Sequence, residues 1–403
     1  MKKRIFIAIH YLEIGGAEIS LIGLLQSIDY SRYDVDLFVY SHRGELMEFI
    51  PPQVNLLPEE KAYSKIEAPL SQTIKSGFLS LALRRASARK KFISYSKRHP
   101  SCGDYPRHYI IAKEVLPSLP SLYKYGEYDL AISFLQPHNI VLEKVKAKKK
   151  ICWIHTDYRS VGEVHEEEIN VWEKYDAIVS ISESVSESFC KAFPSLKSKL
   201  VLMRNILPAT FVRKRAEEIS EEEVEKEMPR KAGVANLLSV GRFSEAKNYE
   251  NVPDICKKML SVGTRVCWYI IGYGSDENQV RSAIAQAGMG KHVKLLGKKA
   301  NPYPYIKACD VYVQPSKYEG NSVTVREAQM LHRPVAITNY ATAASQVEKD
   351  VDGVIVPLDN EGCARELSAF LADNAKIERI TREISHRDYT NQSEIKVLEK
   401  LID

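Results

Sequence analysis

The stretch PSKYEGNSVTVREAQ carries two carboxylates, Glu319 and Glu327, on either side of a glycine turn. The residues before it, 308–314, predict a buried strand, and the residues after Asn321 follow helical spacing. Glu319 is therefore expected at the carboxyl end of a strand, and Glu327 one to two turns into the next helix. Ionised carboxylates accept hydrogen bonds from hydroxyl groups. Two solvated glutamates beside a turn would show the same local pattern, so the surrounding residues decide between the two interpretations.

The start of this predicted helix is a candidate anion site. Ser322 and Val323 would present backbone N–H groups that lack helical partners, and the helix dipole favours negative charge there. Arg242 and Lys247 follow another predicted strand, 235–240. Arginine offers a planar fork of donors and lysine a movable point charge. Two such cations beside a helix start suit a diphosphate group.

Glycines and one further lysine follow other predicted strands. Gly272 and Gly274 come after 264–271, and Lys298 comes after 293–296. Glycine allows a backbone to approach a ligand closely. Each of these residues alone is more often part of an ordinary turn or a solvated surface. The prediction of a site depends on their convergence at the strand ends of one sheet.

Strands that alternate with helices predict two α/β domains in tandem. In the first half, strands are expected at 5–9, 35–40, 129–134, 150–154, 176–181 and 200–206. In the second half, they are expected at 235–240, 264–271, 293–296, 308–314, 335–338 and 353–356. The loop after the first strand contains Gly15 and Gly16 and leads into an amphipathic helix. Loops at the strand ends of two such domains imply a cleft between the domains.

The length of 403 residues also favours two domains, because one compact core rarely grows that large. We expect an N-terminal Rossmann-like domain over 1–207, an acidic connection over 208–232, and a C-terminal Rossmann-like domain over 233–385. The tail, 386–403, is expected to end in a helix, with Ile395, Leu398 and Ile402 on one face.

The composition narrows the class of protein. A net charge of +5 is too small to indicate a nucleic-acid-binding protein by bulk charge. The seven cysteines are odd in number and widely spaced, without a CxxC pair, which favours reduced thiols in the cytoplasm and no zinc site. The first apolar run is short and is interrupted by His10, so a strand is expected there in place of a signal peptide. The chain has no apolar run of the length that spans a membrane.

The segment from Phe78 to Arg98 predicts a basic amphipathic helix. Such a helix can lie on an anionic membrane surface. An ordinary helix with one packed face and one solvated basic face has the same pattern. Both interpretations stay open, and the role of 61–125 as a whole is not predicted.

Several motifs, taken in order, resemble the family 4 retaining glycosyltransferases of the GT-B fold. In the second half these are SVGRFSEAKN, IIGYGSDE and the carboxylate stretch; in the first half they are YLEIGGAEISLIGLL, WIHTDYRS and LMRNI. The resemblance covers nearly the whole chain. It implies an α/β protein of two Rossmann-like domains whose parallel sheets face each other across a cleft, with the C-terminal helix crossing back onto the first domain.

The resemblance also implies a role for each candidate residue. Arg242 and Lys247 would bind the donor diphosphate, and Glu327 the ribose hydroxyls. Glu319 would contact the transferred sugar. The remaining residues expected around the donor are Gly15, Gly16, Gly272, Gly274, Lys298, Gly320, Asn321, Ser322 and Val323. His155 would touch the sugar and help to orient it at the reacting carbon, which makes His155, Glu319, Arg242 and Lys247 the expected catalytic set.

In this family the leaving diphosphate itself is described as helping to deprotonate the acceptor, so no cofactor and no metal are expected. The resemblance implies transfer from a nucleoside diphosphate sugar, most often a UDP-sugar, to a glycan or lipid-linked acceptor. Asn321 and Gln329 depart from the usual pattern, which puts the shape of the sugar pocket in doubt. A nucleotide-sugar epimerase of the same fold and a non-catalytic sugar-nucleotide-binding subunit are the alternatives. The expected location is the cytoplasm, with the inner face of the membrane as the further option that the basic helix leaves open.

Overall fold

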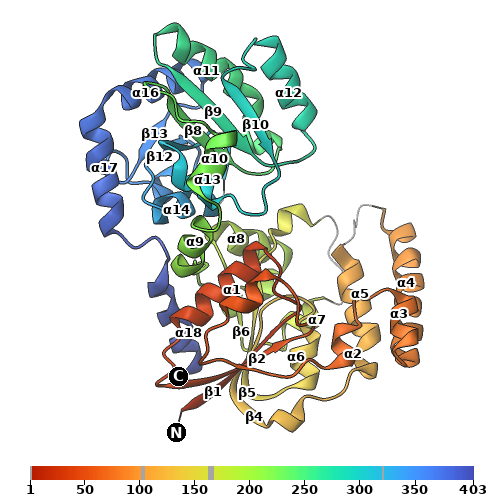
Figure 1. Ribbon diagram of the computed structural model, residues 1–403. Helices are drawn as coiled ribbons and strands as arrows, with labels where there is room; N and C mark the ends of the chain where they lie inside the picture. The colour runs from red at the N-terminus through yellow and green to blue at the C-terminus, as the bar shows by residue number, and fades with distance from the viewer. Residues whose placement is uncertain (1, 101–104, 162–167, 320–321) are drawn as a thin grey trace. The chain divides into compact units, whose positions relative to one another are not determined.

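The computed structural model describes the chain except for residues 1, 101–104, 162–167 and 320–321. The chain divides into two compact units (Figure 1). Unit 1 comprises 1–208 and 391–403, and unit 2 comprises 209–390. Each unit is built around its own parallel sheet, with helices between successive strands.

Unit 1 has the strand order β3-β2-β1-β4-β5-β6-β7. The strands are β1 (Lys3–Ile9), β2 (Tyr33–Val39), β3 (Asn55–Leu56), β4 (Glu127–Ser133), β5 (Lys146–Ile154), β6 (Ala177–Ser180) and β7 (Leu200–Leu202). The chain order reverses between β1 and β4, because β2 and β3 extend the sheet on one side of β1 and the later strands extend it on the other. In open α/β sheets, ligands bind beyond the carboxyl ends of the strands at such a reversal.

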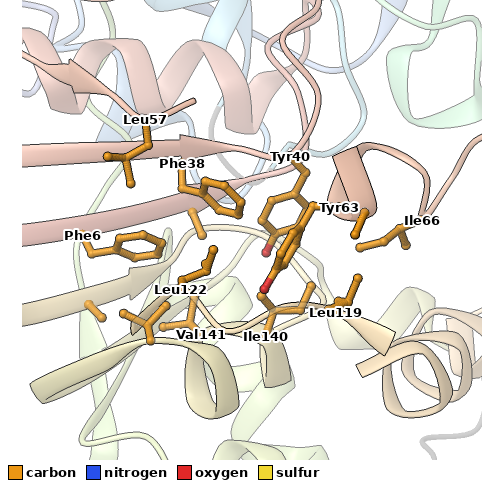
Figure 2. Close-up of a cluster of buried hydrophobic side chains, with 14 of the residues drawn as sticks. Phe6, Phe38, Tyr40, Leu57, Tyr63, Ile66, Leu119, Leu122, Ile140 and Val141 are labelled. Carbon is orange, nitrogen blue, oxygen red and sulfur yellow. The ribbon is translucent and has the colours of Figure 1, made fainter. Parts of the chain in front are cut away.

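In the described residues, unit 1 contains the helices α1 (Gly16–Ser27), α2 (Lys61–Ser64), α3 (Leu70–Lys75), α4 (Leu79–Arg98), α5 (Tyr105–Val115), α6 (Asn139–Lys144), α7 (Ile169–Trp172), α8 (Glu183–Ala192) and α18 (Ile395–Ile402). The helix predicted over 78–98 is α4, whereas α2, α3 and α5 were not predicted. A buried cluster with Phe6, Phe38 and Tyr63 among its members joins the β1–β2 face to α2 (Figure 2). Tyr63 packs edge-on against Phe38, with ring centroids 5.0 Å apart. This packing holds 61–66 on the sheet.

The C-terminal helix α18 belongs to unit 1. Its Leu398 and Ile402 are buried, as their spacing on one helical face predicts. The end of the chain is also held by charge, since Lys3 Nζ lies 2.8 Å from a carboxylate oxygen of Asp403. The chain thus leaves unit 1 after Pro208 and returns to it at Asn391.

Unit 2 has the strand order β10-β9-β8-β11-β12-β13. The strands are β8 (Ala235–Val240), β9 (Val266–Ile271), β10 (Val293–Gly297), β11 (Val311–Gln314), β12 (Val335–Thr338) and β13 (Val354–Val356). The helices are α9 (Ala209–Ala216), α10 (Glu221–Glu227), α11 (Val252–Ser261), α12 (Glu277–Gln286), α13 (Tyr303–Ala308), α14 (Val323–Met330), α15 (Ala343–Gln346), α16 (Asn360–Ala372) and α17 (Asn374–His386). The order reverses between β8 and β11, the same pattern as in unit 1.

The predicted fold class of two parallel-sheet α/β domains is confirmed. Residues 208–232, expected as a connection, form α9 and α10 and pack into unit 2 through buried side chains such as Phe211 and Val224. No helix in the described residues has both the length and the apolar character needed to cross a membrane.

Candidate active site

The order reversal of unit 2 brings two of the predicted residues together. Lys247 follows β8 at the end of a short 3-10 turn, and Glu319 follows β11. Because β8 and β11 are neighbours in the sheet, their following loops meet. Lys247 Nζ lies 2.6 Å from Glu319 Oε1, and both side chains are mostly buried. Residues 72 positions apart in the sequence thus form one charged pair at the place where this sheet class binds ligands.

Glu319 is held by further polar groups from the end of its own strand. Its Oε1 accepts hydrogen bonds from Ser316 Oγ at 2.6 Å and from Gln314 Nε2 at 3.0 Å. Its backbone carbonyl accepts from Thr342 Oγ1 at 2.8 Å. These side-chain contacts all go to Oε1. Within the described residues, Oε2 has no such contact and is available to a ligand hydroxyl.

Arg242 lies in the same β8 loop and is exposed. Its guanidinium forms no ion pair or side-chain hydrogen bond with the residues that the structure describes. An exposed arginine beside a buried lysine can bind an anion without first breaking a protein contact.

The two glycines after β9 have a packing role. A Cβ on Gly272 would lie 1.9 Å from the carbonyl oxygen of Gly241, and a Cβ on Gly274 would lie 2.2 Å from that of Phe243. The β8 and β9 loops are also joined by a hydrogen bond from Phe243 N–H to the Tyr273 carbonyl, at 2.8 Å. These glycines therefore let one loop backbone pack on another. Close approach to a ligand at these two glycines, expected from the sequence, stays a prediction.

Glu327 is buried in α14, with 5% of its surface exposed. Its Oε1 accepts a hydrogen bond from the Tyr303 hydroxyl at 2.7 Å. Burial raises the pKa of Glu327 to about 7, and the Tyr303 hydrogen bond opposes that rise. Burial likewise raises the pKa of Tyr303 well above its ordinary value. Perturbed pKa values cluster at functional sites, so Glu327 stays a candidate site residue.

The remaining donor residues of unit 2 lie at loop ends. Lys298 follows β10, and its Nζ lies 4.8 Å from the ring centroid of Tyr273, which is 51% exposed. Ser322 is the N-cap residue of α14 and Val323 its first residue. Gly320 and Asn321 lie outside the described residues.

Unit 1 carries the other three candidates. Gly15 is the N-cap residue of α1 and Gly16 its first residue, and a Cβ on Gly16 would meet nothing within 4 Å. Packing therefore does not require a glycine at Gly16. His155 directly follows β5. Burial lowers the pKa of His155 to about 4, so the ring is neutral at pH 7, and its Nε2 is buried without a hydrogen-bond partner among the described residues.

Four residues around these candidates were not predicted from the sequence. Gln314 and Ser316 are buried polar residues at a strand end, a signal that was visible in the sequence. Tyr303 and Tyr273 had no such signal, because contacts between residues far apart in the chain bring them to Glu327 and Lys298. The sequence also did not connect Lys247 with Glu319, although it named both.

Comparison with known proteins gives one family match and several relatives. Residues 220–387 match the family model described as glycosyl transferases group 1. The matched range covers the β8 and β11 loops and α14.

Curated relatives match over part of their length. The chain is 31% identical over 143 residues to the amylovoran biosynthesis glycosyltransferase AmsK of Erwinia amylovora, covering 34% of each chain. It is 28% identical over 126 residues to a Campylobacter jejuni N-acetylgalactosamine-N,N'-diacetylbacillosaminyl-diphospho-undecaprenol 4-alpha-N-acetylgalactosaminyltransferase, covering 31% of this chain and 34% of that protein. The chain thus aligns with about a third of the length of these two relatives.

Solved structures match over the full length. Anabaena HepE, crystallised with UDP and glucose, superposes with a TM-score of 0.63 over 99% of both chains at 15% identity. A point mutant of S. aureus TarM, in complex with UDP, Fondaparinux and alpha-GlcNAc-glycerol, superposes with a TM-score of 0.63 over 100% of both chains at 12% identity. The fold is therefore GT-B.

Proposed function

We propose that this protein is a retaining, metal-independent glycosyltransferase. It transfers a sugar from a nucleoside diphosphate sugar, with UDP as the nucleotide, to a glycan or lipid-linked acceptor in the synthesis of a surface polysaccharide or glycoconjugate. The observation that carries the proposal is the Lys247–Glu319 pair at the order reversal of unit 2. The group 1 match over 220–387 and the relatives named above support the same conclusion.

In this proposal the donor diphosphate binds between the β8 loop and the start of α14. Arg242 and Lys247 supply two cations, and the first N–H groups of α14 supply further donors. When the diphosphate arrives, Lys247 can turn from Glu319 toward the phosphate, which frees Oε1 for a sugar hydroxyl. Ser316 and Gln314 keep the Glu319 carboxylate in position during this exchange.

Glu327, as a carboxylate, would accept hydrogen bonds from the ribose hydroxyls. Tyr273 and Lys298 would contact the base, since the exposed ring offers a stacking face and the lysine a donor. His155 would accept or donate a hydrogen bond to the transferred sugar as a neutral ring, because its pKa is far below 7. Gly16 would leave room for the donor at the start of α1.

The reaction follows from this arrangement. As the bond between the anomeric carbon and the phosphate oxygen breaks, negative charge grows on the diphosphate, and the fixed cations stabilise it. The acceptor hydroxyl attacks from the same face, and its proton passes to the leaving phosphate. Retention of configuration follows from this same-face path.

The proposal is tested by nucleotide binding. Thermal shifts of the full-length protein are measured with UDP, GDP, ADP and CMP and with their common sugar conjugates. A nucleotide at a hundred times its Kd stabilises the native state by about 2.7 kcal/mol. We expect one nucleotide to stabilise the wild type and not the Lys247→Ala variant. The control is Lys258→Ala, which removes a partly exposed lysine paired with Glu361 and should behave as wild type. Absence of any shift in the wild type would overturn the proposal.

A second part of the proposal concerns the membrane. On α4, Leu79, Leu83 and Ile93 are exposed by 58%, 63% and 44%. Arg89, Lys90, Lys91, Lys97 and Arg98 are exposed on the same helix. The helix packs on α5 through Ala88 and Tyr95, so its apolar residues are not all used by the core. Exposed apolar side chains among cations fit an anionic lipid surface, which would place the enzyme at the inner face of the membrane.

Vesicle flotation tests this part. We expect the protein to float with phosphatidylglycerol-containing vesicles and not with pure phosphatidylcholine vesicles. Leu83→Ser should reduce flotation, while Leu358→Ser, which removes an exposed leucine of unit 2, should not. Equal flotation with both lipids, or equal effects of both substitutions, would show that α4 is an ordinary solvated helix and does not bind the membrane.

Product analysis separates the alternatives. An epimerase would convert the free nucleotide sugar without releasing the nucleotide, whereas a transferase releases it. A binding subunit would bind the nucleotide sugar and leave it intact. The retained Glu319, Lys247, Arg242 and His155 favour the transferase.

A further inference from the structure

Tyr249, which follows the β8 loop in unit 2, carries a buried polar atom without a partner. The side chain is 1% exposed, and its hydroxyl oxygen has no hydrogen-bond partner among the described residues. Its ring packs edge-on against Phe243, with ring centroids 5.6 Å apart, which fixes the direction of the hydroxyl. A buried donor without an acceptor destabilises the native state. Such an atom indicates a partner that arrives only when a ligand binds.

The backbone directs the Tyr249 and Lys247 side chains to the same place. Asn248, between them, has a φ of 61°, a left-handed conformation that asparagine adopts more readily than most residues. Its Oδ1 accepts a hydrogen bond from Asn251 Nδ2 at 2.6 Å, which fixes the turn. A Cβ on Gly241 would lie 2.7 Å from the Tyr249 hydroxyl and 3.1 Å from Lys247 Cε. The two side chains therefore lie side by side against Gly241.

The group that needs the Tyr249 hydroxyl is the Glu319 carboxylate. Among the described residues its one cationic partner is Lys247, with Nζ 2.6 Å from Oε1. In the proposed function Lys247 turns toward the donor diphosphate, which leaves a mostly buried carboxylate without its cation. Removal of one partner from a buried ion pair is strongly unfavourable. A donor beside the lysine can compensate the carboxylate that the lysine leaves.

Tyr249 can act as that donor because its hydroxyl keeps its proton. Burial raises the pKa of Tyr249 above its ordinary value, and the negative charge of Glu319 acts in the same direction. A lysine ammonium has no acceptor, so the tyrosine proton cannot go to Lys247. A carboxylate has room for several hydrogen bonds, and Glu319 already accepts from Ser316 and Gln314.

We propose that Tyr249 is a positioning residue of the donor site, and that its hydroxyl donates a hydrogen bond to the Glu319 carboxylate when Lys247 moves to the diphosphate of a nucleotide. The lysine and the tyrosine thus replace each other on one carboxylate. The exchange makes the movement of Lys247 less unfavourable and holds Glu319 in place for a sugar hydroxyl. This inference rests on the function proposed above.

The experiment is calorimetric titration of the full-length protein with UDP, GDP and ADP. We expect one of them to bind the wild type, and Tyr249→Phe to weaken that binding by roughly tenfold or more, the effect of one hydrogen bond to a charged group. Without nucleotide, the variant should have a Tm no lower than the wild type, because phenylalanine keeps the ring and removes the unpartnered hydroxyl. Tyr33→Phe is the matched control, since the Tyr33 hydroxyl of unit 1 is also buried without a partner among the described residues. It should leave nucleotide affinity unchanged.

A double-mutant cycle identifies the partner of the hydroxyl. Glu319→Gln should still bind the nucleotide, because Lys247 no longer has to leave a carboxylate. In that background Tyr249→Phe should change the affinity by less than about twofold, since the group that its hydroxyl compensates is gone.

The possible failures are distinct. Equal affinities of the wild type and Tyr249→Phe, or losses that add in the double variant, would overturn this inference and leave the proposed function standing. A lower Tm of nucleotide-free Tyr249→Phe would also overturn it, because the hydroxyl would then support the fold. A wild type that binds none of the three nucleotides would overturn the proposed function and this inference together.

Discussion

Glu327→Gln should make the protein more stable and at the same time disable the donor site. The Glu327 carboxyl has an ordinary pKa of 4.5 in the unfolded chain, and burial raises it to about 7 in the native state. Between these values the native state binds more protons than the unfolded state, so stability falls as the pH rises from about 4.5 and the loss is complete above about 7. One pKa unit corresponds to about 1.4 kcal/mol, so the total loss is roughly 3 kcal/mol.

A glutamine cannot ionise, so the variant escapes this loss. At pH 4 the two proteins should be equally stable, and at pH 8 the variant should be more stable by up to roughly 3 kcal/mol. Part of the gain is offset, because the Tyr303 hydrogen bond to a neutral amide is weaker than to a carboxylate. For a unit of this size the shift in Tm is roughly 6–12 °C at most.

The assay is thermal unfolding of both proteins from pH 4 to pH 8, read as the difference between them so that other titrating groups cancel. If the protein unfolds in more than one transition, the one to compare is the transition whose Tm rises when nucleotide is added to the wild type. Glu366→Gln, on the exposed face of α16, is the control and should show no pH-dependent difference. A pH-independent difference, or a less stable Glu327→Gln variant at pH 8, would refute the reasoning. The same variant should lose nucleotide affinity, since an amide cannot replace a carboxylate that accepts from two hydroxyls.

Three further outcomes are expected. Gly23→Ala should lower the free energy of unfolding by the roughly 1–3 kcal/mol typical of overpacking, and with it the Tm, because its Cβ would lie 2.1 Å from the Ile206 carbonyl oxygen. Gly16→Ala should leave the Tm unchanged and reduce sugar transfer. Leu398→Ser should destabilise unit 1 by roughly 2–4 kcal/mol in denaturant titrations, because it places a hydroxyl where a buried leucine anchors α18; an unchanged midpoint would mean that α18 is not anchored there. Tyr273→Ala should weaken nucleotide binding, measured by calorimetry, by roughly 1–2 kcal/mol through loss of an aromatic contact, and unchanged affinity would show that the base lies elsewhere.

Much of the fold follows from local sequence alone. Runs such as 5–9 and 268–271 are buried on both faces, and parallel strands covered by helices need such runs. Their alternation with helical spacing predicted the α/β class and the strand positions, because burial of each element depends on its own residues. In the segment 61–125 only the helix over 78–98, which is α4, was predicted; α2 and α5 are placed by packing in the buried cluster that contains Phe38, through Tyr63 and Val115.

The candidate site also combines features that local sequence determines with contacts that only the tertiary structure decides. The sequence by itself determined that Lys247 and Glu319 follow strand ends and that Glu327 lies in the next helix, since element positions and side-chain chemistry are local properties. Tertiary structure alone decided that Lys247 meets Glu319 and that Tyr303 meets Glu327. The physical reason is the order of strands in each parallel sheet, which joins loops far apart in the chain and which no local pattern encodes.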